Sequence, residues 1–119
     1  PPTMPAQASE DSPEGAAAFV NYWIALVNFG AVTGNVKQLK ATSRGCEPCT
    51  KLSGALASQE ATERPTKKVW RPSSITPDAV GARATVEVSE GELSQVYDLR
   101  FAITETLPYS VRDIQRITP

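Results

Sequence analysis

The spacing of hydrophobic residues changes past the middle of the chain and divides it into a helical part and a strand part. Between Glu14 and Gly30, apolar side chains recur every three or four residues, which is the period of one face of an α-helix. The preceding Ser12 and Pro13 are a typical N-cap and first helical residue. A helix is therefore predicted from about Pro13 to Gly30, with Trp23 buried in its wide apolar stripe.

Two shorter helices are predicted after the first. Val36 and Leu39 are spaced as on a helix of two turns. Cys49, Leu52 and Leu56 have the spacing of a third helix. The third helix is too short to be stable alone, and a bond between the cysteines is expected to fix its start.

In the second half of the chain the period becomes two, which is the period of β-strands. Four alternating segments, KKVWRPSSI, ARATVEV, QVYDLRFAI and SVRDIQRI, are separated by turn-forming residues. An antiparallel sheet is therefore predicted over residues 66–117. Two irregularities are expected in the sheet. One is at Pro72, which has no amide hydrogen to donate to the ladder of hydrogen bonds. The other is a bulge near Arg112 and Asp113, which would put Ile114 on the same face as the other apolar residues of the last strand.

The register of the central hairpin can be predicted from the side chains that it would bring together. A turn centred on Glu90 and Gly91 sets apolar residues opposite apolar ones and unlike charges opposite each other. The pairs predicted in this register are Val88 with Leu93, Ala84 with Tyr97, Ala82 with Leu99, and Arg83 with Asp98.

The order of three helices followed by strands predicts the fold class. It indicates an α+β fold in which N-terminal helices pack on a curved antiparallel sheet of about four strands. Residues 1–12 are rich in proline and hold almost nothing to bury, so they are predicted to form a disordered or extended tether. Residues 13–119 are predicted to form a single domain.

Length and charge narrow the classes of function. The chain of 119 residues has a net charge of −1, which gives no electrostatic basis for binding nucleic acid or an anionic membrane surface. It holds no histidine, the commonest general base and metal ligand, so no metal site and no cofactor are predicted. No apolar run approaches the roughly 18 residues that span a bilayer. Because the chain begins at Pro1 without an initiator methionine, a targeting segment is expected to precede it.

Two resemblances add to this picture. The long helix with "YW" near its middle, the following "NFGAVTGNVKQL" and the run of strands resemble the ketosteroid-isomerase-like, cystatin-like cone fold. More narrowly, "EGAAAFVNYWIALVNFGAVTGNVKQL" together with "CEPC" resembles an uncharacterised family of actinobacterial lipoproteins. The resemblance implies a cone-shaped domain on the outer face of the cytoplasmic membrane, held by an N-terminal lipid anchor that lies outside this chain. It implies no role for any residue.

Cys46 and Cys49 are the only cysteines, and three interpretations of the pair are open. A structural disulfide in an oxidising compartment is favoured, because the pair has no other partner. Thiol–disulfide catalysis needs a preceding strand in a βαβ unit, which the segment before Cys46 does not provide. A metal site needs two more ligands, and neither histidine nor a second cysteine pair is present.

Other side chains have both a functional and a structural interpretation. The aromatic residues Trp23, Trp70, Tyr97 and Phe101 are candidates for lining a ligand cavity, although such spacing is also typical of a core. Asn21 and Asn28 share a helical face that is expected to meet solvent. A solvated basic edge is predicted for Arg64, Lys67, Lys68 and Arg71.

Three functions are carried forward. The favoured one is a non-enzymatic extracytoplasmic domain that binds a small apolar ligand or an envelope protein. The first alternative is an isomerase- or hydratase-like enzyme that uses Asp98 or Glu87 in a cavity, and the second is a thiol–disulfide protein that uses Cys46 and Cys49. The missing histidine and the lack of a convergent acid–base pair favour binding over catalysis.

Overall fold

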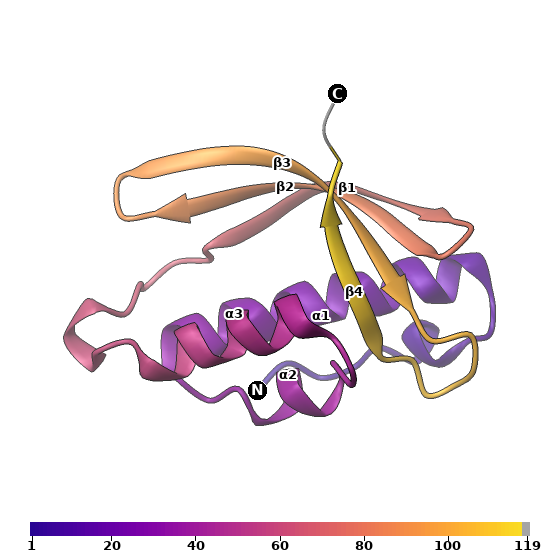
Figure 1. The fold of residues 1–119 in the computed structure, drawn as a ribbon, viewed down its shortest axis with the longest axis horizontal. Coiled ribbons are helices and arrows are strands. Elements are labelled where there is room, and N and C mark those ends of the chain that lie inside the picture. The colour runs from indigo at the N-terminus through magenta and orange to yellow at the C-terminus, as the bar shows by residue number, and fades with distance from the viewer. Residues whose placement is uncertain (118–119) are drawn as a thin grey trace.

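The computed structural model describes residues 1–117 and has two layers, with the helices packed on one face of a four-stranded antiparallel sheet (Figure 1). The predicted α+β class is confirmed, and the strands follow one another in the order β1-β2-β3-β4. The helices are η1 (Ala6–Ser9), α1 (Pro13–Thr33), α2 (Lys37–Ala41), α3 (Glu47–Ser58) and η2 (Ala61–Glu63). The strands are β1 (Trp70–Asp78), β2 (Gly81–Glu90), β3 (Leu93–Ile103) and β4 (Val111–Arg116).

Helix α1 begins where its N-cap predicts and runs three residues past Gly30. The Ser12 hydroxyl accepts a hydrogen bond from the Gly15 amide at 2.9 Å, and the helix ends at Thr33, followed by Gly34 as its C-cap with a φ of 78°. Gly30 is a point of close approach instead of a stop, because a Cβ there would lie 3.0 Å from a methyl of Val36. The predicted start of the helix is therefore confirmed, and its end is three residues later than predicted.

Helix α1 is also the core helix of the domain. The sequence showed no apolar run of membrane-spanning length, but this helix is long and apolar enough to cross a bilayer by length and composition. In the folded domain, however, 67% of that stretch is buried. Trp23 on this helix is completely buried, as predicted, with its ring centroid 5.6 Å from that of Phe101 and 6.1 Å from that of Trp70. The helix thus packs its aromatic side chains directly against the sheet.

The central hairpin has a different register from the predicted one. Its loop consists of Gly91 and Glu92, with Gly91 at a φ of 61°. Each residue of β2 therefore pairs with the residue of β3 two positions later than predicted. Ala84 therefore lies opposite Leu99 instead of Tyr97. A shift of two residues keeps every side chain on its predicted face, because side chains alternate with a period of two. The observed pairs that replace the other predictions are Glu90 with Leu93, Ala82 with Phe101, and Arg83 with Arg100.

Both predicted irregularities of the sheet are present. The register between β1 and β2 shifts between Pro72 and Ser74. On the other edge, Ile103 pairs with Val111 while its neighbour Ala102 pairs with Asp113, which leaves one extra residue between them on β4. This is the β-bulge that the sequence places next to Arg112.

The N-terminal segment is not wholly without structure. Ala6–Ser9 form a short 3-10 helix, and Ala8 in it is buried among the core residues. The Tyr109 hydroxyl donates to the Glu10 carbonyl oxygen at 3.1 Å, and a Cβ at Gly15 would overlap that same oxygen. The prediction of an unstructured tether is therefore wrong for Ala6–Ser9. The sequence did not indicate this contact, because Ala6–Ser9 is too short a segment to show a hydrophobic period.

Candidate functional site

One cavity of the domain is a groove of about 810 Å³ between helix α3, the segment that follows η2, and strands β1 and β2. We call it the α3–β1 groove. The end of α3, the start of β1 and the tip of the β2–β3 hairpin, which contribute to its lining, lie at the same end of the molecule (Figure 1). Its apolar lining is formed chiefly by Leu52, Leu56, Trp70 and Val88. Its charged lining residues are Glu63, Lys67, Lys68, Arg71 and Glu90.

Two helical leucines and a cross-strand pair form the apolar floor of the groove. Leu52 and Leu56 are one turn apart on α3 and partly buried against the core. Trp70 and Val88 face each other across β1 and β2, and both are partly buried. Trp70 also packs against the buried Trp23, so the floor of the groove is continuous with the core.

Asn28 fixes the strand that carries Trp70. Its side-chain oxygen accepts hydrogen bonds from the amides of Val69 at 2.9 Å and Trp70 at 2.8 Å, and its Nδ2 donates to the Trp70 carbonyl at 2.9 Å. The prediction that Asn28 faces solvent beside Asn21 is wrong, since Asn21 is exposed and Asn28 is buried. Because β1 is an edge strand, these main-chain groups have no strand partner, and the Asn28 amide replaces one.

Arg64 joins the C-terminal ends of α1 and α3, which lie beside the groove. Its guanidinium donates to the carbonyl oxygens of Leu56 at 2.9 Å and Gln59 at 2.8 Å, near the end of α3. It also donates to the Ala31 carbonyl at 3.4 Å, near the end of α1. Arg64 thus satisfies carbonyl groups that the two helix ends leave unpaired, and it is not part of the solvated edge predicted from the sequence.

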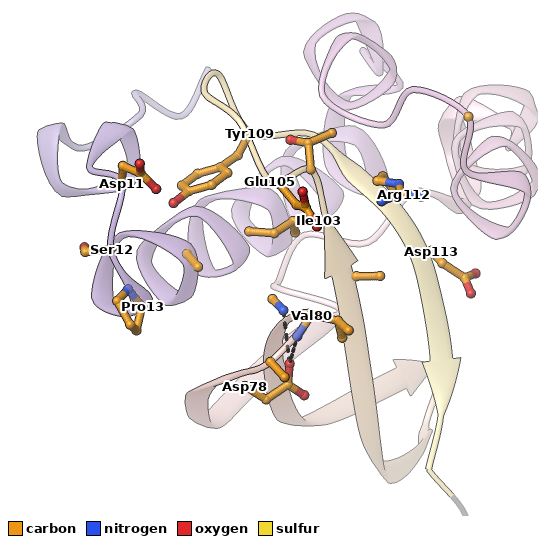
Figure 2. A pocket seen from close by; sticks show the side chains of 16 residues that line it. Asp11, Ser12, Pro13, Asp78, Val80, Ile103, Glu105, Tyr109, Arg112 and Asp113 are labelled. Carbon is orange, nitrogen blue, oxygen red and sulfur yellow. Dashed lines mark hydrogen bonds between the residues drawn. The ribbon is translucent and has the colours of Figure 1, made fainter.

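The second cavity, of about 700 Å³, is a cleft rich in carboxylates (Figure 2). It lies between the start of α1, the β1–β2 turn and the β3–β4 loop. The Asp78 carboxylate makes its hydrogen bonds within the protein. Its Oδ1 accepts from the amides of Val80 and Gly81 in the β1–β2 turn, both at 3.0 Å. Its Oδ2 accepts from Arg100 at 3.0 Å. In residues 1–117 no three potential metal ligands gather at one point.

The four predicted ligand-binding aromatic residues do not form one site. Trp23 and Phe101 are completely buried in the core and line neither cavity. Tyr97 also lines neither cavity; its ring lies 4.8 Å from the guanidinium carbon of Arg116. Trp70 alone of the four lines the α3–β1 groove. The leucines that complete the floor were expected only as the apolar face of a helix.

The two candidate catalytic carboxylates lie outside both cavities. Asp98 accepts a hydrogen bond from the Thr85 hydroxyl at 2.8 Å, and its carboxylate is 3.9 Å from the Arg83 guanidinium. Glu87 pairs with Arg71 at 3.0 Å, and its pKa is lowered by the hydrogen bond from Arg71 and then by that from Ser94. Both carboxylates are thus solvent-exposed partners in surface pairs, and neither is placed against a bound molecule.

Comparison with known protein families matches residues 1–109 to a family of unknown function, DUF6318. The chain belongs to this family. Every lining residue of the α3–β1 groove falls within the matched part of the chain. Comparisons with curated proteins and with solved structures gave no significant match. Membership of DUF6318 brings no activity with it.

In this DUF6318 domain, the cysteines are at disulfide distance at the entry to α3. Cys46 is the N-cap residue, and its sulfur accepts a hydrogen bond from the Cys49 amide in the first turn at 3.2 Å. Both side chains are almost completely buried, with 2% of Cys46 and 1% of Cys49 exposed. The pair therefore fixes the start of the helix whose Leu52 and Leu56 form the groove floor.

Replacing both cysteines by serine is expected to lower the free energy of unfolding by about 1–3 kcal/mol, because the lost loop is short. Equilibrium denaturation of Cys46→Ser, Cys49→Ser measures this cost, and each single substitution should cost about as much, since either one breaks the bond. Binding in the groove should persist in the double variant. Loss of binding with unchanged stability would instead make the cysteine pair part of the functional site.

Proposed function

We propose that this protein is a non-enzymatic binding domain that takes a small apolar ligand into the α3–β1 groove. The observation that carries the proposal is the combination of a volume of about 810 Å³ with a floor of leucine, valine and tryptophan side chains. Small-molecule sites are typically clefts of about 300–1,000 Å³ with mostly apolar walls. Three contacts hold the floor in place for a ligand. Asn28 holds the start of β1, Arg64 holds the end of α3, and the cysteine pair holds the start of α3.

The proposal places this domain outside the cytoplasm, on the outer face of the cytoplasmic membrane. It adopts the lipoprotein resemblance of the segment from Glu14 to Cys49, and the cone-shaped domain that goes with it. A further support is the buried cysteine pair, because disulfides persist mainly in oxidising compartments. An anchor upstream of Pro1 would hold the groove close to the membrane, where apolar molecules are concentrated.

The enzymatic alternatives have less support from the geometry. Asp98 and Glu87 are exposed and lie outside both cavities, so an isomerase or hydratase would need another acid or base. A thiol–disulfide protein needs an accessible sulfur, whereas Cys46 and Cys49 are buried. The binding proposal uses the residues that do line a cavity.

A second candidate is an envelope protein bound at the sheet edge. Strand β4 pairs with β3 only from Leu99 to Ile103, so in residues 1–117 the part of β3 before Asp98 has no strand partner on that side. Val96 on this part is 66% exposed, which favours addition of an extended segment from a partner. The two candidates are distinguished by the place of binding, because Val96 does not line the α3–β1 groove.

Titration with N-phenyl-1-naphthylamine, a neutral apolar fluorophore, tests the proposed function. The domain should bind the dye saturably, and Leu56→Gln should weaken binding about tenfold, because an apolar contact of roughly 1.5 kcal/mol is lost from the floor. Leu93→Gln is the matched control, since Leu93 is exposed at the hairpin tip and does not line the groove.

Circular dichroism spectra must first show that both variants are folded. Equal dye binding by Leu56→Gln and Leu93→Gln would contradict the assignment of the ligand to the groove. Absence of saturable binding in the unchanged domain would overturn the proposed function itself.

A further inference from the structure

We propose that the ligand of the α3–β1 groove is a free single-chain amphiphile with an anionic head group. Its apolar chain would lie on the floor formed by Leu52, Leu56, Trp70 and Val88, and its head would meet Lys67 and Lys68. This inference rests on the proposed function, because it names the class of ligand for the same groove. The proposed function specifies only that the ligand is apolar, and this inference adds that one end of the ligand carries a negative charge.

The first argument is the charge around the groove. The charged side chains of the lining are three cations (Lys67, Lys68 and Arg71) and two carboxylates (Glu63 and Glu90), and Arg71 is paired with Glu87, which lies outside the lining. Lys67 and Lys68 are therefore the two cations of the lining that are left for a ligand, and they are neighbours in the chain. A negative head group would be attracted to these two adjacent positive charges.

The second argument is that the two lysines are free to bind a ligand. Arg71 is already occupied, because it pairs with Glu87 at 3.0 Å and donates to the Ser89 hydroxyl at 2.7 Å. Within residues 1–117, neither Lys67 nor Lys68 has a carboxylate oxygen within 4.0 Å of its ammonium group. Both side chains are exposed at the edge of an apolar cavity, so an anion could approach them without breaking an existing ion pair.

The third argument is that the backbone that carries the lysines is held in place. The Lys68 carbonyl accepts a hydrogen bond from Arg71 at 2.7 Å. The next residue, Val69, donates its amide to Asn28 at 2.9 Å and its carbonyl accepts from Ser89 at 2.8 Å. These bonds fix the main chain from Lys68 to Trp70, so the attachment point of the Lys68 side chain has a constant position relative to the groove floor. Such preorganisation lowers the entropic cost of holding a ligand with two different ends.

Glu63 and Glu90 are expected to have the opposite effect on ligand binding from that of Lys67 and Lys68. They line the same groove, so they should oppose an anionic head while leaving a neutral one unaffected. Removing the lysine charges should weaken binding of an anion, and removing the two carboxylate charges should strengthen it. A neutral amphiphile with the same chain should respond to neither change, because its affinity comes from the apolar floor.

The test compares decanoate with decanol, which share a chain length, at concentrations below micelle formation. Each is titrated into the domain by displacement of bound N-phenyl-1-naphthylamine. Decanoate should bind about 3- to 10-fold more tightly than decanol, the range expected for two exposed ion pairs. The double variant Lys67→Gln, Lys68→Gln should lose this preference without a change in decanol affinity, whereas Glu63→Gln, Glu90→Gln should increase it.

The matched control is Lys37→Gln, Lys40→Gln, which removes the same charge from α2, where neither residue lines the groove. This variant should keep the preference for decanoate. Equal binding of decanoate and decanol, or an equal loss of preference in the control, would overturn the anionic head while leaving the groove as an apolar site. Failure of both amphiphiles and of the dye to bind would overturn the proposed function as well.

Discussion

Replacing Trp23 by alanine is expected to lower the free energy of unfolding by about 3–5 kcal/mol. The side chain is completely buried and lies between Phe101 and Trp70, so its removal leaves a cavity where α1 meets the sheet. Its indole nitrogen also donates to the Ser43 hydroxyl at 2.9 Å, and that contact is lost too. Chemical denaturation followed by far-UV circular dichroism measures the cost.

The size of the stability loss decides whether Trp23 is a core residue or lines a ligand cavity. The control is Phe29→Ala, an aromatic truncation at a half-buried position on the same helix, which should cost clearly less than Trp23→Ala. Trp23→Phe should fall between the two, because it keeps an aromatic ring but loses the bond to Ser43. A cost below about 1 kcal/mol for Trp23→Ala would show that the side chain borders an open cavity, as the sequence allowed.

Replacing Asn28 by leucine is expected to lower the free energy of unfolding by about 2–4 kcal/mol. Leucine has a similar size but cannot bond to the two amides and the carbonyl that Asn28 satisfies, and each buried unpaired group costs about 1–3 kcal/mol. The loss should be concentrated at the start of β1, where hydrogen exchange of the Val69 and Trp70 amides would become faster.

Asn21→Leu is the matched control for Asn28→Leu. The two residues are seven positions apart on α1, but Asn21 is exposed, so its replacement should change stability by no more than about 0.5 kcal/mol. Asn28→Asp should be less damaging than Asn28→Leu, because a carboxylate still accepts from both amides. If Asn21→Leu and Asn28→Leu were equally stable, the role of Asn28 in holding β1 would be wrong.

The fold could be predicted because the longest helix and the strands each have a pattern that can be recognised within their own residues. Helix α1 has an N-cap, a proline at its first position and a long apolar stripe, and the strands alternate with a clear period of two. The hairpin register could not be fixed in the same way. A shift of two residues leaves Ala82 and Ala84 on the same face, so the hydrophobic pattern fits both registers equally well. The position of the turn at Gly91 decides between them.

The candidate site was predicted only in part, because most of it depends on which elements meet. Trp70 was recognised as a candidate from its type, whereas Leu56 was recognised only as part of a helical stripe. Asn28 and Arg64 resemble solvated polar residues in the sequence. They become supports of the groove only because Asn28 meets an unpaired strand edge and Arg64 meets two helix ends. Contacts of this kind have no local pattern in the sequence.

The most direct test of the account is to locate a bound amphiphile by NMR. Intermolecular nuclear Overhauser effects between the decanoate chain and the methyl groups of the domain would identify the side chains in contact with it. The account predicts contacts to Leu52, Leu56 and Val88, with none to Ile103, which lines the carboxylate-rich cleft. Contacts to Ile103, or to Val96 on the free edge of β3, with none to the two leucines, would contradict the assignment of the ligand to the α3–β1 groove.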